Sequence, residues 1–354
     1  MIILSIETSC DETSLALVEA KGGIKHPKFR VIENIVSSQI SLHAPFGGVV
    51  PNIAKREHLK NLPVIFNRIL KNPASKKIEA VAVTVGPGLE PALWTGVNFA
   101  KEVKLKLKTD SPKLKLVGVN HMEGHLYSFL LSQKTQLPVS DFKFSKTKTF
   151  PAIGLVVSGG HTILLLLKSL TEWKRLGETR DDAVGEAFDK VARMLGLPYP
   201  GGPEIEKAAR KGDENSVLFP RPMMKDKNYD FSFSGLKTSV LYYIRDHEEQ
   251  SKNKEFIEDV AASFQKAAVE TLVYKSMRAS KEYKAKSVIL AGGVAANKYL
   301  RKSLSKAASE SGLNFFAPDM EFNTDNAAMI AAASYIQILK KKRRRIAAES
   351  NLTL

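Results

Sequence analysis

The sequence contains a single cysteine, Cys10, among its 354 residues. One thiol forms neither an internal disulfide nor a cage of several thiolates, so any bound metal ion must be held by nitrogen and oxygen atoms. Long apolar runs are also missing: residues 163–167 are typical of the longest, and a bilayer requires roughly 18. A disulfide scaffold and a membrane-spanning protein are therefore excluded, and no membrane partner is expected.

The first residues lack the features of a secretion signal. Residues 1–7 carry no basic segment and turn polar early, so they predict a β-strand and not a signal peptide. The chain also has no Gly-x4-Gly-Lys-Ser/Thr motif, which excludes a Walker nucleotide site. We therefore expect a cytoplasmic protein. If it binds a nucleotide, it does so without a Walker motif.

Basic residues outnumber acidic ones throughout the chain. Lysine and arginine total 53 against 37 aspartates and glutamates, which gives a net charge of +16. Clusters recur at residues 101–108, 113–115, 143–148 and 340–345. This distribution favours a polyanion such as nucleic acid, whose phosphates are neutralised in many places. A general requirement for solubility would produce the same excess, so charge alone leaves both interpretations open.

His121 and His125 are four residues apart, a spacing that places two imidazoles on one face of a helix, where they can hold one metal ion. Residues 114–119 predict a strand, and the helix is expected to begin near His121, a common place for chemistry in open α/β sheets. Gly124 lies in the turn that would face the ligand and leaves room for close approach. Two histidines at this spacing also occur by accident, and a metal ion would need a third ligand from elsewhere in the chain.

Two segments repeat a strand, a polar turn and a second strand. The copies comprise residues 2–7, 8–14 and 15–19, and then 152–157, 158–162 and 163–167. Such a duplication predicts an α/β fold of two related lobes, a duplicated ribonuclease H-like fold of the actin-like ATPase kind with a cleft between the lobes. The predicted organisation is an N-terminal lobe with the histidine pair at 1–130, a linker or insertion at 131–150, a C-terminal lobe with nucleotide-binding turns at 151–324, and at 325–354 a helix that returns to the first lobe followed by a basic tail.

Glycines mark the turns of the second half. Gly159 and Gly160 suit a tight hairpin, and without side chains their N–H groups can also be directed at an anion. Gly292 and Gly293 connect a strand to a helix predicted at 295–302, whose N-terminus favours negative charge. We expect these turns to hold an adenylate-like ligand.

Carboxylates follow one of these turns. Asp181 and Asp182 open a helix predicted at 181–195 and suit the dipole at its start. Asp189 lies past the first turn, and it is followed by a tight turn and helix start at residues 201–206. The carboxylates at this second turn are candidates for binding a ribose.

Three other carboxylates are candidates for catalysis or metal binding. Asp11 and Glu12, in the first polar turn, are the candidate catalytic residues because they can position water or a reactive carbonyl, although they would also suit a cap of the turn. Asp325 is either a helix cap or the missing oxygen ligand of the metal ion.

The motifs together resemble those of one known family. In order they are residues 6–13, 86–89, 121–125, 157–162, Asp189, 199–203, 230–238, 291–294 with Asn297, and 324–326. They resemble the TsaD family of tRNA N6-adenosine threonylcarbamoyltransferases, from residue 1 to about 335. The resemblance implies an actin-like ATPase fold and the transfer of threonylcarbamoyl from threonylcarbamoyl-AMP to N6 of the adenosine 3′ of the anticodon, in tRNAs that read ANN codons.

The resemblance also implies roles for particular residues. His121, His125 and Asp325 would hold one metal ion, expected to be Fe2+ with Zn2+ as an alternative. The residues implied to contact the adenylate are Val156, Val157, Ser158, Gly159, Gly160, Asp189, Gly202, Glu206 and Asn297. A mixed anhydride requires no phosphoryl transfer, only a Lewis acid and correct orientation of the attacking adenine amine.

At His161 the chain resembles the bacterial branch of the family. Archaeal and eukaryotic relatives more often carry Asn at this position, and a Tyr that binds the metal ion at the position of Val156. The expected partners are therefore tRNA, a TsaB-like paralogue and a TsaE-like ATPase. Two segments depart from typical bacterial members, the longer linker at 131–150 and the basic ending at 340–345. This basic run is either a disordered, solvated end or a contact for tRNA.

Three other functions compete with acyl transfer. A zinc endopeptidase would place Glu directly after the first histidine, where this chain has Met122, and Glu123 would point away from the histidine face. A sugar or acetate kinase on the same fold has no use for His121 and His125. A non-catalytic partner resembling the TsaB-like paralogues would typically lack both histidines.

Overall fold

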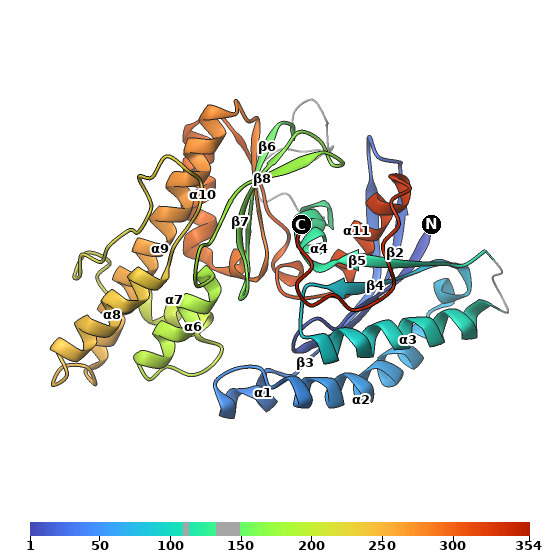
Figure 1. Cartoon of the computed structure of the whole chain (residues 1–354), viewed down its shortest axis with the longest axis horizontal. Helices are drawn as coiled ribbons and strands as arrows, with labels where there is room; N and C mark the ends of the chain where they lie inside the picture. The colour runs from blue at the N-terminus through green and yellow to red at the C-terminus, as the bar shows by residue number, and fades with distance from the viewer. Residues whose placement is uncertain (109–112, 132–148) are drawn as a thin grey trace. The chain divides into compact units, whose positions relative to one another are not determined.

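Two five-stranded sheets built on one plan form the framework of the computed structural model (Figure 1). The structure describes residues 1–108, 113–131 and 149–354. These residues form two compact units, Met1–Lys146 with Pro318–Leu354 and Thr147–Ala317, which are described separately. Most of the predicted linker at 131–150, with the basic cluster at 143–148, lies outside the described residues.

The first sheet has the strand order β3-β2-β1-β4-β5. Strands β1, β2 and β3 pair antiparallel, whereas β4 and β5 continue parallel to β1. The bounds are β1 (Ile2–Glu7), β2 (Glu12–Lys21), β3 (Lys28–Ser38), β4 (Ile78–Gly86) and β5 (Lys115–Asn120).

The second sheet repeats this arrangement in the order β8-β7-β6-β9-β10. Strands β6, β7 and β8 pair antiparallel, and β9 and β10 continue parallel to β6. The bounds are β6 (Ala152–Val157), β7 (Thr162–Leu167), β8 (Trp173–Glu178), β9 (Ser287–Ala291) and β10 (Asn314–Phe316). The predicted duplication and the α/β fold with ribonuclease H-like lobes are thus confirmed.

Helices surround both sheets. In the first unit they are α1 (Ile40–His43), α2 (Pro51–Leu70), α3 (Glu90–Lys108), α4 (His121–Tyr127) and α11 (Ala327–Leu339), with 3-10 turns η1 (Ala44–Phe46), η2 (Pro73–Lys77), η3 (Ser128–Leu131) and η5 (Met320–Phe322). In the second unit they are α6 (Val184–Met194), α7 (Gly201–Ala209), α8 (Ser234–Asp246), α9 (Lys254–Glu282) and α10 (Lys298–Glu310), with the 3-10 turn η4 (Gly293–Ala296). None of the helices among the residues that the structure describes combines the length and the apolar character of a membrane crossing.

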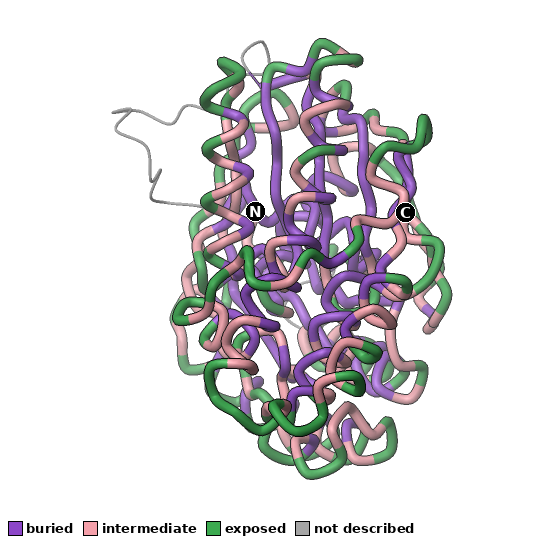
Figure 2. The backbone as a smooth tube through the Cα atoms, turned by 90° about the vertical axis from the view of Figure 1, so that its left-hand side faces the viewer, coloured by how far each residue is buried: buried purple, intermediate pink, exposed green. Residues whose placement is uncertain are grey.

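Burial follows the sequence pattern. The central strands β6 and β9 are buried along their whole length and, apart from Ser287, apolar, as expected for strands covered on both faces. Helix α11 is apolar on all sides and nearly all of it is buried, because it packs against β1, β2, β5 and α4 within the first unit. Figure 2 shows buried backbone segments in purple in the interior and exposed segments in green, many of them at outer turns.

Several predicted boundaries differ from the structure, and three of them lie beside candidate site residues. Strand β2 begins at Glu12, so the first polar turn is shorter than predicted, because Thr13 and Ser14 are buried within the pairing with β3. Helix α6 begins at Val184, so Asp181 and Asp182 precede it. The helix after Gly292 begins only at Lys298, because a 3-10 turn comes first.

Candidate functional site

Helix α4 begins directly at the end of β5 and carries both histidines. Asn120 caps it, since its Oδ1 accepts hydrogen bonds from the N–H groups of Met122 at 2.8 Å and Glu123 at 3.2 Å. The rings of His121 and His125 lie on one face with centroids 4.6 Å apart. The predicted helix start and the shared histidine face are confirmed.

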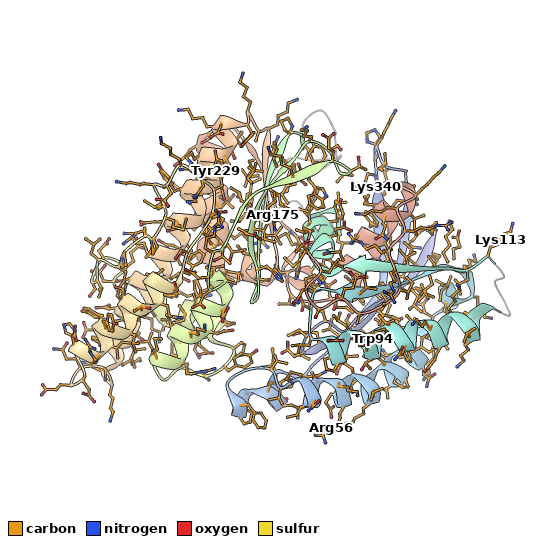
Figure 3. All side chains as sticks on the ribbon, viewed as in Figure 1. Arg56, Trp94, Lys113, Arg175, Tyr229 and Lys340 are labelled. Atoms are coloured by element: carbon orange, nitrogen blue, oxygen red, sulfur yellow. The ribbon has the colours of Figure 1, made fainter. Side chains whose placement is uncertain are left out.

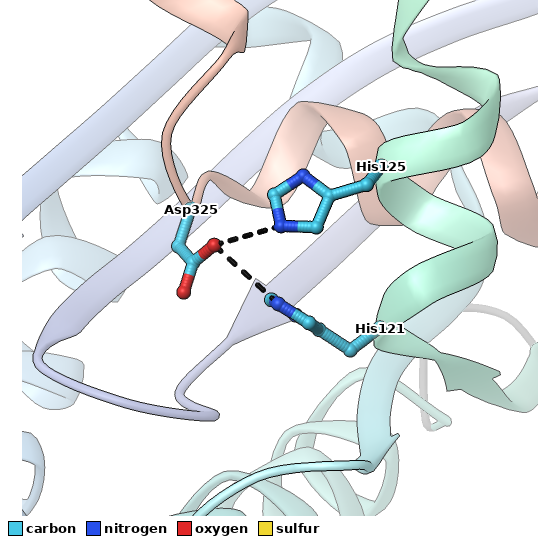
Figure 4. Close-up of side chains that lie close together, drawn as sticks. All are labelled: His121, His125 and Asp325. Carbon is cyan, nitrogen blue, oxygen red and sulfur yellow. Dashed lines mark ion pairs between the residues drawn. The ribbon is translucent and has the colours of Figure 1, made fainter. Parts of the chain in front are cut away.

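Asp325 approaches the pair from the loop before α11. Its Oδ1 lies 3.4 Å from Nε2 of His121 and 3.1 Å from Nε2 of His125 (Figure 4). The three candidate ligand atoms lie within 4.8 Å of one another, so a small inward movement of the side chains would bring all three to the distance of about 2 Å at which they could bind one cation. The cap of α11 is Asn326, which accepts a bond from the N–H of Met329 at 3.0 Å. The alternative that Asp325 caps the helix is therefore wrong.

The surroundings of His125 fit a metal ion. The residue is fully buried, and neither ring nitrogen makes a hydrogen bond to any described residue, although Nε2 faces Asp325. Buried polar atoms normally have a partner, because leaving them without one is costly. Two imidazole nitrogens and one carboxylate oxygen are donors typical of catalytic zinc and iron sites, which leave further positions open. His121, His125 and Asp325 form a candidate metal-binding group.

Glu7, at the end of β1, binds the ring nitrogen of His121 that does not face Asp325. Its Oε2 accepts bonds from Nδ1 of His121 at 3.0 Å and from the hydroxyl of Thr84 at 2.6 Å, and its Oε1 accepts one from the N–H of Ser9 at 2.6 Å. Such a carboxylate fixes the orientation of a ligating imidazole. Glu7 is not among the site residues predicted from the sequence, where its one signal is a charge at the end of an apolar strand.

Charges within this group shift two pKa values. Burial opposes ionisation of Glu7, but the charge and hydrogen bond of His121 outweigh burial and hold the pKa of Glu7 below its ordinary value. Burial also opposes protonation of His121, but Asp325 and Glu7 raise its pKa to about 9. A proton therefore occupies His121 at neutral pH in the metal-free protein, and a metal ion must displace it.

Asp11 and Glu12 belong to the same unit, and Glu12 interacts electrostatically with Asp325 and with Asp11. Burial first, and then the charges of Asp325 and Asp11, raise the pKa of Glu12 to about 10. Glu12 thus keeps its proton at neutral pH in the metal-free protein, which suits a hydrogen-bond donor better than a general base. Asp11 is largely buried, and its backbone carbonyl accepts a bond from the N–H of Gln39 at 3.0 Å. The catalytic role of the two residues stays a prediction.

In the second unit, the predicted adenylate-contacting residues 156–160 span the end of β6 and the turn after it. The turn there is closed by a bond from the Ser158 N–H to the His161 carbonyl at 2.8 Å. A Cβ at Gly159 or Gly160 would meet no atom within 4 Å, so both glycines border open space. A Cβ at Gly292 would lie only 2.2 Å from the Val157 carbonyl oxygen, which places the glycine corner after β9 directly beside this turn.

Asp189, on α6, binds the start of helix α7. Its Oδ1 accepts bonds from the N–H groups of Gly201 at 2.8 Å and Gly202 at 3.2 Å, which belong to the first turn of α7. Farther along α7, Glu206 forms an ion pair with Arg210 at 2.6 Å. Asp189 therefore has a structural role at the start of α7 in addition to any contact with a ligand.

Asn297 lies at the start of α10 and connects it to neighbouring helices. Its Oδ1 accepts a bond from the N–H of Leu300 at 2.8 Å, and its Nδ2 donates to Gln265 at 2.8 Å. The adjacent N–H of Lys298 lies 3.4 Å from Glu206 Oε2. Through these bonds, Asn297 connects the start of α10 to α9, and Glu206 connects it to α7.

Other predicted residues are placed differently. Val156 and Val157 are fully buried in β6, so their side chains belong to the core. Asp181 accepts four bonds from the start of α8, from the N–H groups of Phe233 and Ser234 and the hydroxyls of Ser232 and Ser234. Its role at the dipole of α6 is therefore corrected to an anchor for α8.

A model of the TsaD family, described as tRNA N6-adenosine threonylcarbamoyltransferase, matches residues 30–332. The chain belongs to this family. Among its relatives, the tRNA N6-adenosine threonylcarbamoyltransferase of Thermosipho africanus is 48% identical over 337 residues, which cover 95% of this chain and 94% of the relative. Those of Moorella thermoacetica and Halalkalibacterium halodurans are 47% and 45% identical and cover 96% and 95% of this chain, and 92% and 91% of the relatives.

Solved structures show that the TsaD chain shares its fold with more distant proteins. HypF from T. kodakarensis matches with a TM-score of 0.59 at 16% identity, covering 95% of this chain and 47% of HypF. Full-length HypF in a phosphate- and nucleotide-bound form matches with a TM-score of 0.56 at 14% identity, covering 96% of this chain and 55% of HypF. This chain spans about half the length of these proteins, and at such low identity the likeness concerns the fold alone.

Proposed function

We propose that this chain transfers the threonylcarbamoyl group from threonylcarbamoyl-AMP to N6 of the adenosine 3′ of the anticodon in tRNAs that read ANN codons. The observation that carries the proposal is the group of Asp325 and the buried His121 and His125 in a chain that belongs to the TsaD family. In the reaction, adenine N6 attacks the carbamoyl carbon, the bond from that carbon to the AMP phosphate oxygen breaks, AMP leaves with the electron pair, and N6 loses one proton.

The first unit would hold the cation and orient its ligands. His121 and His125 would bind it through Nε2 and Asp325 through a carboxylate oxygen, while Glu7 keeps the His121 ring oriented. Fe2+ is the expected ion and Zn2+ the alternative, since both accept imidazole and carboxylate ligands. When bound, the ion supplies Lewis acidity to the carbamoyl or threonyl oxygens. Asp11 and Glu12 are proposed to position the reacting groups.

The second unit would bind the adenylate. In the turn after β6, Gly159 and Gly160 could present their backbone N–H groups to open space, and Gly202 at the start of α7 borders a second open space. Asp189, Glu206 and Asn297 would position these segments through the bonds described above. Val156 and Val157 would contribute only through their backbone, because their side chains are buried.

Basic residues on both units would bind tRNA phosphates. Arg56 on α2, Lys113 before β5 and Arg175 on β8 are exposed (Figure 3). Contacts to phosphates position a nucleic acid without reading its sequence, so the choice among tRNAs would come from other contacts. We also propose that a TsaB-like paralogue and a TsaE-like ATPase act with this chain.

The reaction itself provides the test. The purified chain is incubated with threonylcarbamoyl-AMP, the two partner proteins and an ANN-reading tRNA, and the tRNA nucleosides are analysed by mass spectrometry. We expect N6-threonylcarbamoyladenosine with the wild-type chain and at least a tenfold lower yield with His121→Ala. His26→Ala, which changes an exposed histidine of the same unit, is the matched control. Equal yields from wild type and His121→Ala would contradict the metal-assisted mechanism, and no product from wild type would contradict the proposed function.

A further inference from the structure

Glu123 lies between the two histidines in sequence, but its carboxylate is used on another side of α4. Its Oε1 accepts a bond from Nη2 of Arg344 at 2.8 Å and lies 3.6 Å from Nζ of Lys342. The Glu123 side chain is only 6% exposed and that of Arg344 16% exposed. A buried carboxylate requires a partner, and the partner here belongs to the basic run near the C-terminus. The prediction of a solvated end is therefore wrong for Arg344.

A second bond joins the C-terminal segment, defined here as residues 342–354, to the start of α4. The Asn120 side chain that caps α4 through its Oδ1 donates a bond from Nδ2 to the carbonyl of Thr353 at 3.0 Å. This bond fixes the orientation of the amide, so that its oxygen is turned toward the helix. Figure 1 shows the dark red end of the chain beside α4.

Between these two points the C-terminal segment lies against β4 and β5. The N–H of Glu349 donates to the Val85 carbonyl at 2.7 Å, and the N–H of Gly88 donates to the Ser350 carbonyl at 3.2 Å. A Cβ at Gly86 would lie 1.9 Å from the Glu349 carbonyl oxygen. The glycine at that position therefore lets the segment approach the strand end closely.

Helix α4 is held from another side by α11. A Cβ at Gly124 would lie 2.8 Å from the side chain of Ile330 and 3.2 Å from that of Met329. Since α4 has only seven residues, it gains little stability from its own hydrogen bonds. Its position depends on contacts with α11, whose preceding loop supplies Asp325, and with the C-terminal segment.

We propose that the C-terminal segment is a clamp that keeps α4 in register with Asp325, and that Arg344 and Glu123 are positioning residues for the metal-binding group. Neither residue would touch the ion. Loss of their pairing would let the two imidazoles shift against Asp325, and the site would bind a cation more weakly and with altered geometry. The proposal rests on the metal-binding role given to His121, His125 and Asp325 in the proposed function.

Cobalt binding tests the clamp without requiring catalysis. Co2+ alone is titrated into the metal-free full chain, and its visible absorption reports affinity and coordination geometry. We expect Arg344→Ala to weaken Co2+ binding about tenfold and to change the absorption bands. Arg344→Lys, which can still reach Glu123, is expected to recover part of the affinity. Arg343→Ala is the matched control, because it removes an exposed charge from the neighbouring position.

Hydrogen exchange of the metal-free chain gives a second measurement. Arg344→Ala is expected to speed amide exchange of residues 121–127 while leaving that of the second unit unchanged. If Arg344→Ala does not fold, Glu123→Gln tests the same pairing, because it keeps the size of the side chain and removes its charge.

The outcomes separate two failures. Unchanged Co2+ affinity, spectrum and exchange in a folded Arg344→Ala or Glu123→Gln variant would overturn the clamp. Absence of Co2+ binding by the wild type would contradict the metal site of the proposed function, whereas the exchange measurement would still decide whether the segment holds α4.

Discussion

Glu7 accepts a hydrogen bond from Nδ1 of His121 at 3.0 Å, and Nε2 of the same ring lies 3.4 Å from Asp325. The two carboxylates thus assign the two ring nitrogens to different roles. Nδ1 is used for orientation and Nε2 is left for a cation. A neutral imidazole has one donor and one acceptor nitrogen, so the bond to Glu7 selects the tautomer that a metal ion requires.

Replacing Glu7 tests this relationship. Glu7→Gln is expected to lower metal affinity about 10- to 100-fold, because an amide neither selects the tautomer as strongly nor supplies negative charge. The measurement is competition for Zn2+ with a fluorescent chelator. Glu79→Gln, at an exposed position in β4, is the control. Identical affinities of the two variants would contradict a supporting role for Glu7.

Metal binding is expected to strengthen as the pH rises toward 9. The pKa of His121 is raised to about 9, so below that value each binding event must release this proton. One displaced proton makes the affinity rise about tenfold per pH unit. Calorimetric titrations at pH 7 in buffers of different ionisation enthalpy would count the proton. An observed enthalpy that is the same in every buffer would exclude its release.

Two glycines of the second unit are expected to respond differently to alanine. Gly160→Ala should change stability by no more than about 0.5 kcal/mol, because its Cβ would meet no atom within 4 Å, but it should obstruct an anion at the turn. Gly292→Ala should destabilise by about 1 to 3 kcal/mol, because Gly292 has a φ of 95° and its Cβ would clash with the Val157 carbonyl. Thermal unfolding and AMP titration measure the two effects. Strong AMP binding by folded Gly160→Ala would argue against a ligand at this turn.

A substitution can separate the structural role of Asp189 from its proposed role in ligand binding. Asp189→Asn keeps an Oδ1 acceptor for Gly201 and Gly202, so its stability should stay within about 1 kcal/mol of wild type. If the carboxylate also holds the ribose, AMP affinity should fall about tenfold, or about 1.4 kcal/mol. AMP titration by calorimetry decides this point. Unchanged affinity would limit Asp189 to anchoring α7.

Lys275 on α9 predicts a pH dependence of stability. It is fully buried and donates to the carbonyls of Asn228, at 3.4 Å, and Asp230. Burial, with the charge of Arg278, lowers its pKa from 10.5 to about 8. Between these values the unfolded chain binds the proton and the folded chain does not, so the contribution to stability rises with pH from about 8 to 10.5.

The comparison with Lys275→Met isolates this contribution. Wild type should gain up to about 3 kcal/mol relative to the variant across that interval, measured by urea unfolding at several pH values. The difference between the two proteins is the relevant quantity, because the pKa of His121, raised to about 9, lies in the same pH interval. A constant difference would show that Lys275 keeps its charge.

Much of the local structure was predictable from the sequence. The strand, turn and strand copies followed from short apolar segments separated by polar residues, and the structure confirms both. The shared face of His121 and His125 followed from helical periodicity alone. The prediction was wrong where a side chain bonds to a distant element. Asp181, for example, binds the start of α8 and not the helix α6 that it precedes.

The basic C-terminal run shows the same limit more clearly. A sequence of consecutive lysines and arginines indicates a solvated segment, yet Arg344 is paired with Glu123, 221 positions away. No local pattern distinguishes Arg344 from Arg343 or Arg345. Only the path of the segment across β4 and β5 determines which side chain faces α4.

By itself, the sequence determined the duplicated strand pattern and the helical spacing of the two imidazoles in the candidate metal-binding group, because these depend on residues close together in the chain. The tertiary structure alone decided that Glu7 and Asp325 meet opposite nitrogens of His121 and that Arg344 meets Glu123. Those pairings join residues more than one hundred positions apart, and their geometry is set by sheet order and by the seating of α4, neither of which is encoded in any local segment.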